Sequence, residues 1–204
     1  MQQFVSTVLA FALTAWLFGC APSRPVVMRA SPLADQILQY DQGRQIFISR
    51  SVHSSVGLAL PTETVQPGNP VDFYITVANH LSNPFNFSTD NIRAQCGQKT
   101  IYVYHPKEAL RDQEKRTELS SSDLAGLSPT DILALSPQIK NYYQRRNQEL
   151  RDFAHSLLQA QTIMADSTHD GVVRIAFPSC TDKLELIIKT GEDVHRFEFD
   201  TIVK

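Results

Sequence analysis

The sequence lacks the short motifs that mark the commonest nucleotide-binding, hydrolytic and redox sites. It contains no P-loop, no G-x-G-x-x-G, no G-x-S-x-G, no H-E-x-x-H and no C-x-x-C. Catalytic groups can still converge from distant positions, so this absence makes an enzyme less expected without excluding one. We therefore expect a non-enzymatic protein without a cofactor, and we assign neither catalytic residues nor metal ligands.

The chain also lacks an excess of either charge. It has 19 Lys and Arg against 21 Asp and Glu, a formal net charge of -2, and a pI near 6.3. This balance provides no basic surplus to hold nucleic acid, so we expect no nucleic-acid partner. With 204 residues, 42% of them hydrophobic, the chain is long enough for one domain with a real core and short for two.

No charged residue occurs before Gly19, and the stretch from Phe4 to Phe18 is almost entirely apolar. This run is shorter than the roughly 20 residues that span a bilayer, and it is typical of the core of a signal peptide. Trp16, the single tryptophan, lies within it. We expect residues 1–19 to be an export signal and the mature chain to contain no tryptophan.

The end of this run, Leu17-Phe18-Gly19-Cys20, resembles the lipobox of bacterial lipoproteins, in which the cysteine is acylated and becomes the mature amino terminus. The resemblance implies that Cys20 carries several acyl chains, which together hold a protein stably on a membrane. Ala21 follows, whereas an Asp at this position commonly signals inner-membrane retention in that family, so the resemblance implies the outer membrane of a bacterial envelope. An ordinary secretory signal or a single apolar anchor is the alternative.

Beyond Cys20 the chain contains two cysteines, Cys96 and Cys180. An even pair in an exported chain favours a disulfide, with a contribution on the order of 4 kcal/mol in the chain-entropy model. Two buried free thiols are the alternative. A catalytic cysteine is less favoured, because neither has a histidine nearby in the sequence to lower its pKa.

Residues 20–44 are expected to be the lipidated cysteine and a tether. The stretch contains three prolines and no sustained period, with one short helix predicted from Leu33 to Tyr40.

Alternating apolar and polar residues predict seven or eight short strands after the tether. In the clearest one, VDFYITVAN, Val71, Phe73, Ile75 and Val77 share one face. The other strand candidates are residues 45–52, 56–60, 85–87 running into 91–95, 100–105, 172–177, 183–189 and 195–203.

The composition between the two β blocks, at about residues 107–166, is rich in Gln, Arg, Glu, Leu and Ala and predicts a helical insertion. Ser128 and Ser136 each precede a proline, as an N-cap precedes a first helical position. The second helix is predicted from Pro137 to Met164, with an apolar face that packs on the sandwich or on a partner. The residues near that face are Ile139, Tyr143, Leu150, Phe153, Leu157 and Met164.

The stretch VQPGNPVDFYITVANHLSNPFNFSTDN, from Val65 to Asn91, resembles in rhythm the immunoglobulin-like domains of bacterial surface lipoproteins. The resemblance implies architecture and no functional residues. We predict a mainly β fold over residues 45–204: an immunoglobulin-like antiparallel β-sandwich of seven or eight strands with an α-helical insertion.

Two groups of side chains are candidates for a site. Tyr and Arg are enriched at binding hot spots, so the possible partner-binding residues are Tyr142, Tyr143, Arg145 and Arg146, although helix packing is the commoner use of such tyrosines. Asp166, His169 and Asp170 have metal-ligand chemistry, but a solvated loop ending at Gly171 explains them better.

Three classes of function follow. The leading hypothesis is a non-enzymatic envelope lipoprotein that docks another envelope protein at the membrane. A module that binds a small ligand or a cell-wall glycan is the second, and it predicts an aromatic-lined pocket with converging polar groups. A hydrolase is the third, and it predicts a nucleophile and a base brought together across the two β blocks.

Overall fold

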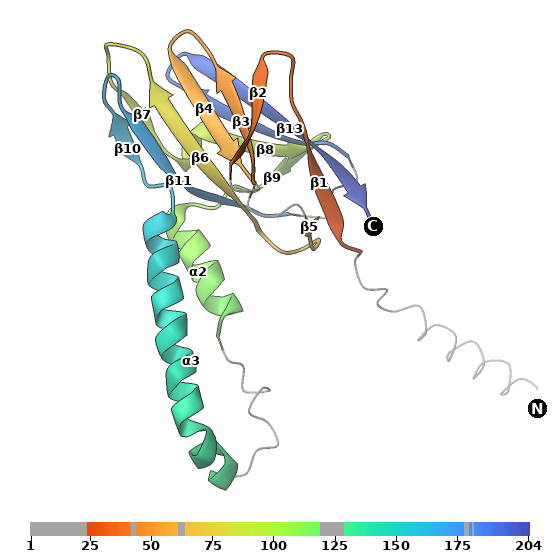
Figure 1. Cartoon of the computed structure of the whole chain (residues 1–204), viewed down its shortest axis with the longest axis vertical. Helices are drawn as coiled ribbons and strands as arrows, with labels where there is room; N and C mark the ends of the chain where they lie inside the picture. The colour runs from red at the N-terminus through yellow and green to blue at the C-terminus, as the bar shows by residue number, and fades with distance from the viewer. Residues whose placement is uncertain (1–23, 42–43, 61–63, 119–128, 178–179, 181) are drawn as a thin grey trace, which may run out of the picture.

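The computed structural model describes residues 24–41, 44–60, 64–118, 129–177, 180 and 182–204 (Figure 1). Two antiparallel sheets pack face to face, and a short ribbon of two strands joins them at one side. The first sheet has the order β5 (Thr64–Val65), β1 (Val26–Ser31), β13 (Asp193–Val203), β12 (Leu184–Thr190), β8 (Ile92–Cys96), β9 (Lys99–Ile101). The second has the order β11 (Thr168–Ile175), β6 (Val71–Asn79), β4 (Ser54–Ala59), β3 (Arg44–Arg50), β2 (Gln36–Asp41). The ribbon pairs β10 (Gln161–Ile163) with β7 (Phe85–Phe87), and a 3-10 turn covers Thr89–Asn91.

The predicted mainly β sandwich with a helical insertion is therefore confirmed. The strands of the described chain are more numerous than the seven or eight expected, because short edge and ribbon strands carry little periodic signal.

The core lies between the two sheets and follows from strand alternation. Every second residue of β6, from Val71 to Asn79, is buried, including Phe73 at 0% exposed. Phe47 of the second sheet packs edge-on against Phe199 of the first, with ring centroids 5.4 Å apart. Burying each such ring contributes about 1.5–3 kcal/mol, so these contacts hold the two sheets together.

The predicted disulfide is present. Cys96 at the end of β8 is bonded to Cys180, with the two Cα atoms 6.1 Å apart. Because Cys180 lies between β11 and β12, the bond ties the segment that connects the two sheets to β8.

The predicted tether is wrong over most of its length. Residues 26–31 form β1 between β13 and β5, and residues 36–41 form β2 where a helix was expected. Val26 and Met28 alternate into the core, and Pro25 and Pro32 flank β1 without interrupting its hydrogen bonds. The sandwich therefore begins near residue 26, while Cys20 and the expected signal at residues 1–19 lie outside the described residues.

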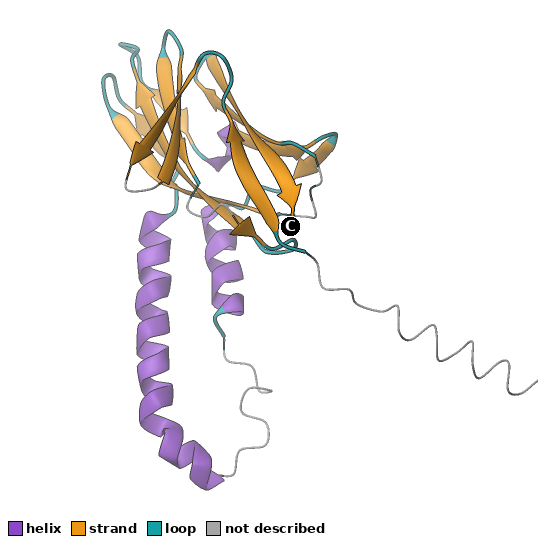
Figure 2. Cartoon of the chain, turned by 45° about the vertical axis from the view of Figure 1, so that its right-hand side comes forward, coloured by secondary structure: helices purple, strands orange, loops and turns teal. Residues whose placement is uncertain are grey.

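The insertion forms two helices, α2 (Pro106–Arg116) and α3 (Pro129–Ser156), which leave the same end of the sandwich (Figures 1 and 2). Helix α3 begins before the predicted Pro137 and ends before the predicted Met164, because Leu157 and Leu158 leave the helix to bond with β11. Leu157 is buried as expected, but beyond the helix, and Met164 is exposed. No helix in the described part of the chain is long and apolar enough to cross a bilayer.

Candidate functional site

The most distinctive feature of the molecule is the pair of helices α2 and α3, which we call the helical arm (Figure 2). Both ends of the arm attach to the edge of β11 that does not pair with β6. Before the arm, the Tyr104 N–H donates to Arg174 O and the Ala176 N–H donates to Tyr102 O. After the arm, the Leu158 N–H donates to Val172 O. Strand β11 therefore positions the whole arm.

Gly171 makes the attachment after the arm possible. A Cβ atom at this position would lie 2.5 Å from Leu158 Cα, a separation that real Cβ atoms do not tolerate. Without a side chain at Gly171, Leu158 reaches the core and becomes fully buried.

Arg174 connects the sheet to both helices at the root of the arm. Its Nε and Nη2 donate to the two carboxylate oxygens of Asp72 on β6, at 2.7 and 2.8 Å. Its Nη1 lies 3.3 Å from Asp112 Oδ2 and 3.4 Å from Ala109 O, both on α2. On α3, the Phe153 ring centroid lies 4.4 Å from the guanidinium carbon.

With 5% of its surface exposed, Arg174 is a buried cation whose donors are satisfied in the bidentate geometry that guanidinium favours. Sequence reasoning assigned it no role. The available signal was an arginine inside the otherwise apolar run VVRIAF.

Two of the four predicted partner-binding residues, Tyr142 and Arg146, bond to the end of α2, and the Tyr142 ring also packs edge to face on Tyr143 with centroids 5.6 Å apart. Tyr142 Oη donates to Thr117 O, and Arg146 Nη2 donates to Glu114 O at 3.0 Å. These bonds satisfy carbonyls at the end of α2, which a helix leaves unpaired.

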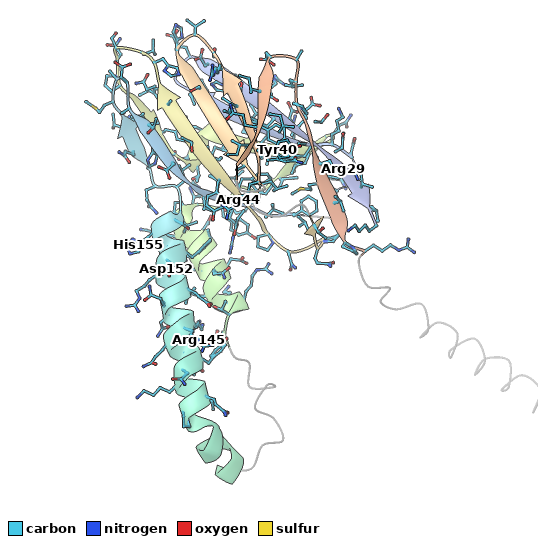
Figure 3. All side chains as sticks on the ribbon, viewed as in Figure 1. Arg29, Tyr40, Arg44, Arg145, Asp152 and His155 are labelled. Carbon is cyan, nitrogen blue, oxygen red and sulfur yellow. A yellow bond between two sulfur atoms is a disulfide. The ribbon has the colours of Figure 1, made fainter. Side chains whose placement is uncertain are left out.

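Tyr143, 40% exposed, and Arg145, also exposed, lie on either side of that α2-facing stripe, as 100° per residue dictates. Figure 3 labels Arg145 on α3. Part of the predicted surface is thus occupied inside the arm, and Tyr143 and Arg145 remain accessible.

The second predicted cluster does not converge. The loop interpretation is wrong for His169, Asp170 and Gly171, because all three belong to β11. His169 Nε2 lies 2.9 Å from Gln159 O, and Asp166 occupies a turn with φ 52°. Within the described ranges no group of three His, Cys, Asp or Glu side chains is placed to hold a metal ion.

The structure does bring a serine, a histidine and an aspartate together across the two β blocks. Ser54 Oγ lies 2.9 Å from His195 Nε2 and donates to Asp193 Oδ2 at 2.7 Å. Ser54 Oγ also lies 2.6 Å from Thr190 Oγ1, so the serine hydroxyl is shared among three neighbours and is not paired with His195 alone. Nδ1 of His195 faces Ser49 Oγ at 2.9 Å, where a catalytic triad places a carboxylate.

Burial also separates these groups from any substrate, since Ser54 is 0% and His195 1% exposed. Burial lowers the pKa of His195, and this effect exceeds the rise in pKa caused by the negative charges of Asp193 and Asp35. The ring is therefore neutral at pH 7. For Asp193, burial alone raises the pKa, but hydrogen bonds from Ser54, Ser51 and the His53 N–H exceed it and leave the pKa lowered. The cluster is a polar link between the sheets.

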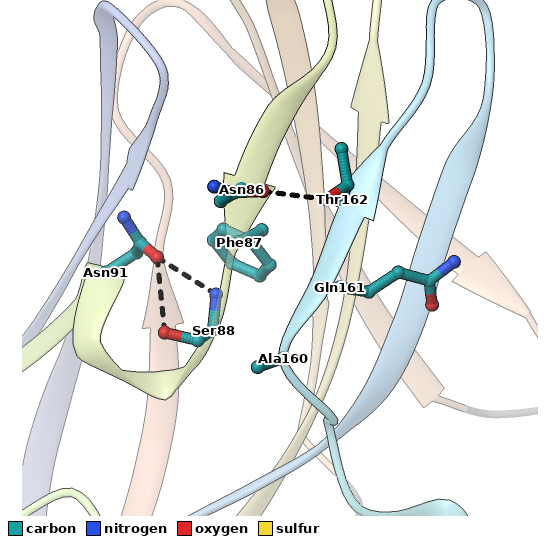
Figure 4. A pocket seen from close by; sticks show the side chains of 7 residues that line it. All are labelled: Asn86, Phe87, Ser88, Asn91, Ala160, Gln161 and Thr162. Atoms are coloured by element: carbon teal, nitrogen blue, oxygen red, sulfur yellow. Dashed lines mark hydrogen bonds between the residues drawn. The ribbon is translucent and has the colours of Figure 1, made fainter.

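Open hollows occur elsewhere on the surface. One of about 270 Å³ lies where β7 and β10 run side by side (Figure 4). Two of its amide oxygens are already engaged, since Thr162 Oγ1 donates to Asn86 Oδ1 and Asn91 Oδ1 accepts from the Ser88 N–H. Another, of about 310 Å³, lies on the outer face of the second sheet and is lined by Ile46, Ile48, Arg50, Ser55, Gly57, Thr76 and Ala78. A third lies beside α2.

Comparison with known proteins adds little. No protein-family model matches the sequence, and no curated protein matches it. Among solved structures, a functionally unknown protein from Listeria monocytogenes EGD-e is similar over 88% of this chain and 85% of its own, with 11% identity and a TM-score of 0.33. A likeness this weak carries no argument about fold or function.

Proposed function

We propose that this protein is a non-enzymatic lipoprotein of the bacterial envelope that docks another envelope protein through its helical arm. One observation carries the proposal: α3 continues well past α2. Helix α3 has 28 residues and α2 has 11, which correspond to about 42 Å and 16 Å at 1.5 Å per residue. Tyr142 and Arg146 meet the last turn of α2, so the part of α3 before Tyr142 extends beyond it.

The projecting helix makes little contact with the rest of the described chain. Between residues 137 and 149, only Ile139 and Arg146 are partly covered, and the other side chains are exposed. Most helical stability in proteins comes from packing of a helix face, so a long helix with so little packing is well suited to a partner that covers it. Tyr143 and Arg145 supply side chains that are enriched at such interfaces.

A lipid at Cys20 fits this arrangement. Val26 begins β1 six positions after Cys20, so the chain between them spans at most about 20 Å. The arm and the start of β1 lie at the same end of the sandwich in Figures 1 and 2. Helix α3 is longer than the roughly 20 Å that the segment after Cys20 can span, so it does not fit upright between the sandwich and the membrane. In our account the arm therefore lies along the membrane surface, and its partner is a protein at the same membrane.

A hydrolase receives no support from the geometry, because the Ser54–His195 pair is buried and His195 Nδ1 faces Ser49 where a catalytic triad places a carboxylate. Binding of a sugar is a second candidate function, favoured by the hollow beside α2.

Site-specific photo-cross-linking in cells tests the docking proposal. A photoreactive side chain is placed at Tyr143 or Arg145, and at Val52, 83% exposed on the sandwich, as the control. We expect both arm positions to yield an adduct with the same envelope protein and the control to yield none. Arm positions without an adduct, in a protein that is folded and abundant, contradict docking, and so does an equal adduct from Val52.

A further inference from the structure

The hollow beside α2 has two aromatic rings on one wall. The segment after β9 is extended, so Tyr102 and Tyr104 point to one side while Val103 between them bridges to Ile175 of β11. The two rings lie 5.2 Å apart in an edge-to-face arrangement, and Tyr102 is 52% exposed. The planes of the rings are inclined by 75°, so the exposed ring of Tyr102 forms an accessible apolar platform and the Tyr104 ring stands nearly perpendicular beside it.

One face of α2 forms the opposite wall. The lining residues of this helix are Glu108, Arg111, Asp112 and Lys115, which helical spacing places on a single face. Together with the two tyrosines they enclose an open hollow of about 260 Å³. Drug-sized ligands occupy roughly 300–1,000 Å³, so this hollow suits one ring-sized group of a longer ligand that continues into solvent.

The acidic groups of the hollow are largely occupied. Tyr102 Oη and the His105 N–H both donate to Glu108 Oε2, and the hydrogen bond from Tyr102 is the main reason why the pKa of Glu108 is lowered. Asp112 is shared between Arg174 and Arg116 at the root of the arm.

The cationic groups are not held in ion pairs, although the charge of Arg111 is among the smaller causes of the lowered pKa of Glu108. Arg111 and Lys115 are exposed and form no ion pair with any residue in the described part of the chain. They lie four residues apart on α2, so their charges point to the same space. The hollow thus offers an aromatic platform, one hydrogen-bonding carboxylate and two available cations.

We propose that this hollow binds an acidic hexopyranose, a sugar ring that carries a carboxylate, within a glycan. The apolar face of the sugar ring packs on the exposed ring of Tyr102 and meets Tyr104 at its edge, and a ring hydroxyl donates to Glu108. The sugar carboxylate pairs with Arg111 and Lys115 in charge-assisted hydrogen bonds. A neutral sugar leaves both cations without a partner, and an acidic peptide lacks the pyranose ring with its apolar face. The inference is independent of docking through α3.

Calorimetric titration of the full chain tests the site with three probes: trigalacturonic acid, the neutral maltotriose and the peptide triaspartate. We expect trigalacturonic acid to bind and the other two to bind at least about tenfold more weakly, because each lacks one half of the recognition. Arg111→Gln should weaken trigalacturonic acid binding about tenfold. Arg93→Gln, which removes the same charge from an exposed position on β8, should leave it unchanged.

Because Arg111 is exposed, its substitution should leave the fold intact, which a thermal melt checks. Tyr104→Phe keeps the aromatic platform and should keep binding within about twofold. The proposal is overturned if trigalacturonic acid does not bind, if triaspartate binds equally well, or if Arg93→Gln weakens binding as much as Arg111→Gln. The last result reveals general charge attraction without a site.

Discussion

At the scale of single residues, Arg174 decides how the arm is attached. It pairs with Asp72 of the sheet and Asp112 of α2, and Phe153 of α3 covers it. Pairs of this kind add little net stability compared with apolar residues of the same shape, but removing one partner leaves the other charges unpaired. The arrangement is therefore sensitive to any substitution that removes the guanidinium.

Arg174→Met tests that sensitivity. We expect the free energy of unfolding to fall by about 2–4 kcal/mol, because the two half-buried carboxylates lose their shared cation. Urea unfolding of the variant measures the loss. Arg145→Met, at an exposed position, is the control and should lie within about 0.5 kcal/mol of the parent. Equal stabilities for the two variants would contradict the assignment.

His195 gives the stability a pH dependence. Its pKa is lowered from the ordinary value of 6.5, so the unfolded chain takes up the proton first as the pH falls. The stabilising contribution of the neutral His195 ring is then fully present above about pH 6.5. At lower pH the free energy of unfolding decreases, by up to about 1.4 kcal/mol per pH unit. The pKa of Asp193 is lowered from 3.8, so protonation of this carboxylate affects the free energy of unfolding only at much more acidic pH.

Urea unfolding at pH 7.5, 6.5 and 5.5 should therefore show a clear decrease only in the last step. His195→Gln should remove that decrease, and if the variant does not fold, titration of the ring protons by NMR reports the pKa of His195 directly. A stability that is constant from pH 7.5 to 5.5 is the contrary result.

At the scale of elements, the sequence predicted what local periodicity encodes. The alternation in VDFYITVAN predicted β6 correctly, because one face of that strand is buried and the other is not. The helix predicted from Leu33 to Tyr40 was wrong. The segment contains most of β2, an edge strand whose apolar residues, such as Ile37 at 41%, are partly exposed, so the strand has no clear alternation. Arg174 with Asp72, and Ser54 with His195, are 102 and 141 residues apart, so local patterns carry no information about their contacts.

Gly171→Ala tests the joint between α3 and β11. The added Cβ meets the Leu158 backbone at 2.5 Å, so we expect a loss of about 1–3 kcal/mol in the free energy of unfolding. Gly57→Ala on β4 is the matched control, because its Cβ comes no closer than 3.8 Å to Thr76. That variant should keep or slightly raise the stability, because alanine restricts the unfolded chain. Losses of equal size would show that the close approach to Leu158 is not the cause.

At the scale of the whole molecule, the sandwich is a support that holds an arm near the proposed lipid. Strands β1 and β2 occupy the stretch that was expected to be a tether, which leaves only a short segment after Cys20. In our account the arm is thereby confined close to the membrane. This confinement raises the effective concentration of the arm around a membrane partner without any additional contact.

Cys20→Ser tests the anchor. We expect the variant to leave the membrane fraction while keeping the melting temperature of the sandwich, because its strands begin at Val26. Fractionation of cells with immunoblotting measures the first and a thermal melt the second. An unchanged membrane fraction contradicts lipidation at Cys20.

The most direct test of the central claim shortens the arm and leaves its root intact. Removing residues 107–166 would delete Leu158 and Ile163 from the core, so the sharper variant replaces residues 119–140 with a short Gly-Ser linker. Thr117 and Tyr142 already touch, so such a linker can join them. In cross-linking pull-downs from cells, we predict that the native chain recovers a near-stoichiometric envelope partner and that the shortened, folded and membrane-bound variant loses it. Recovery of the same partner by the shortened variant, or no partner with the native chain, contradicts docking through the arm.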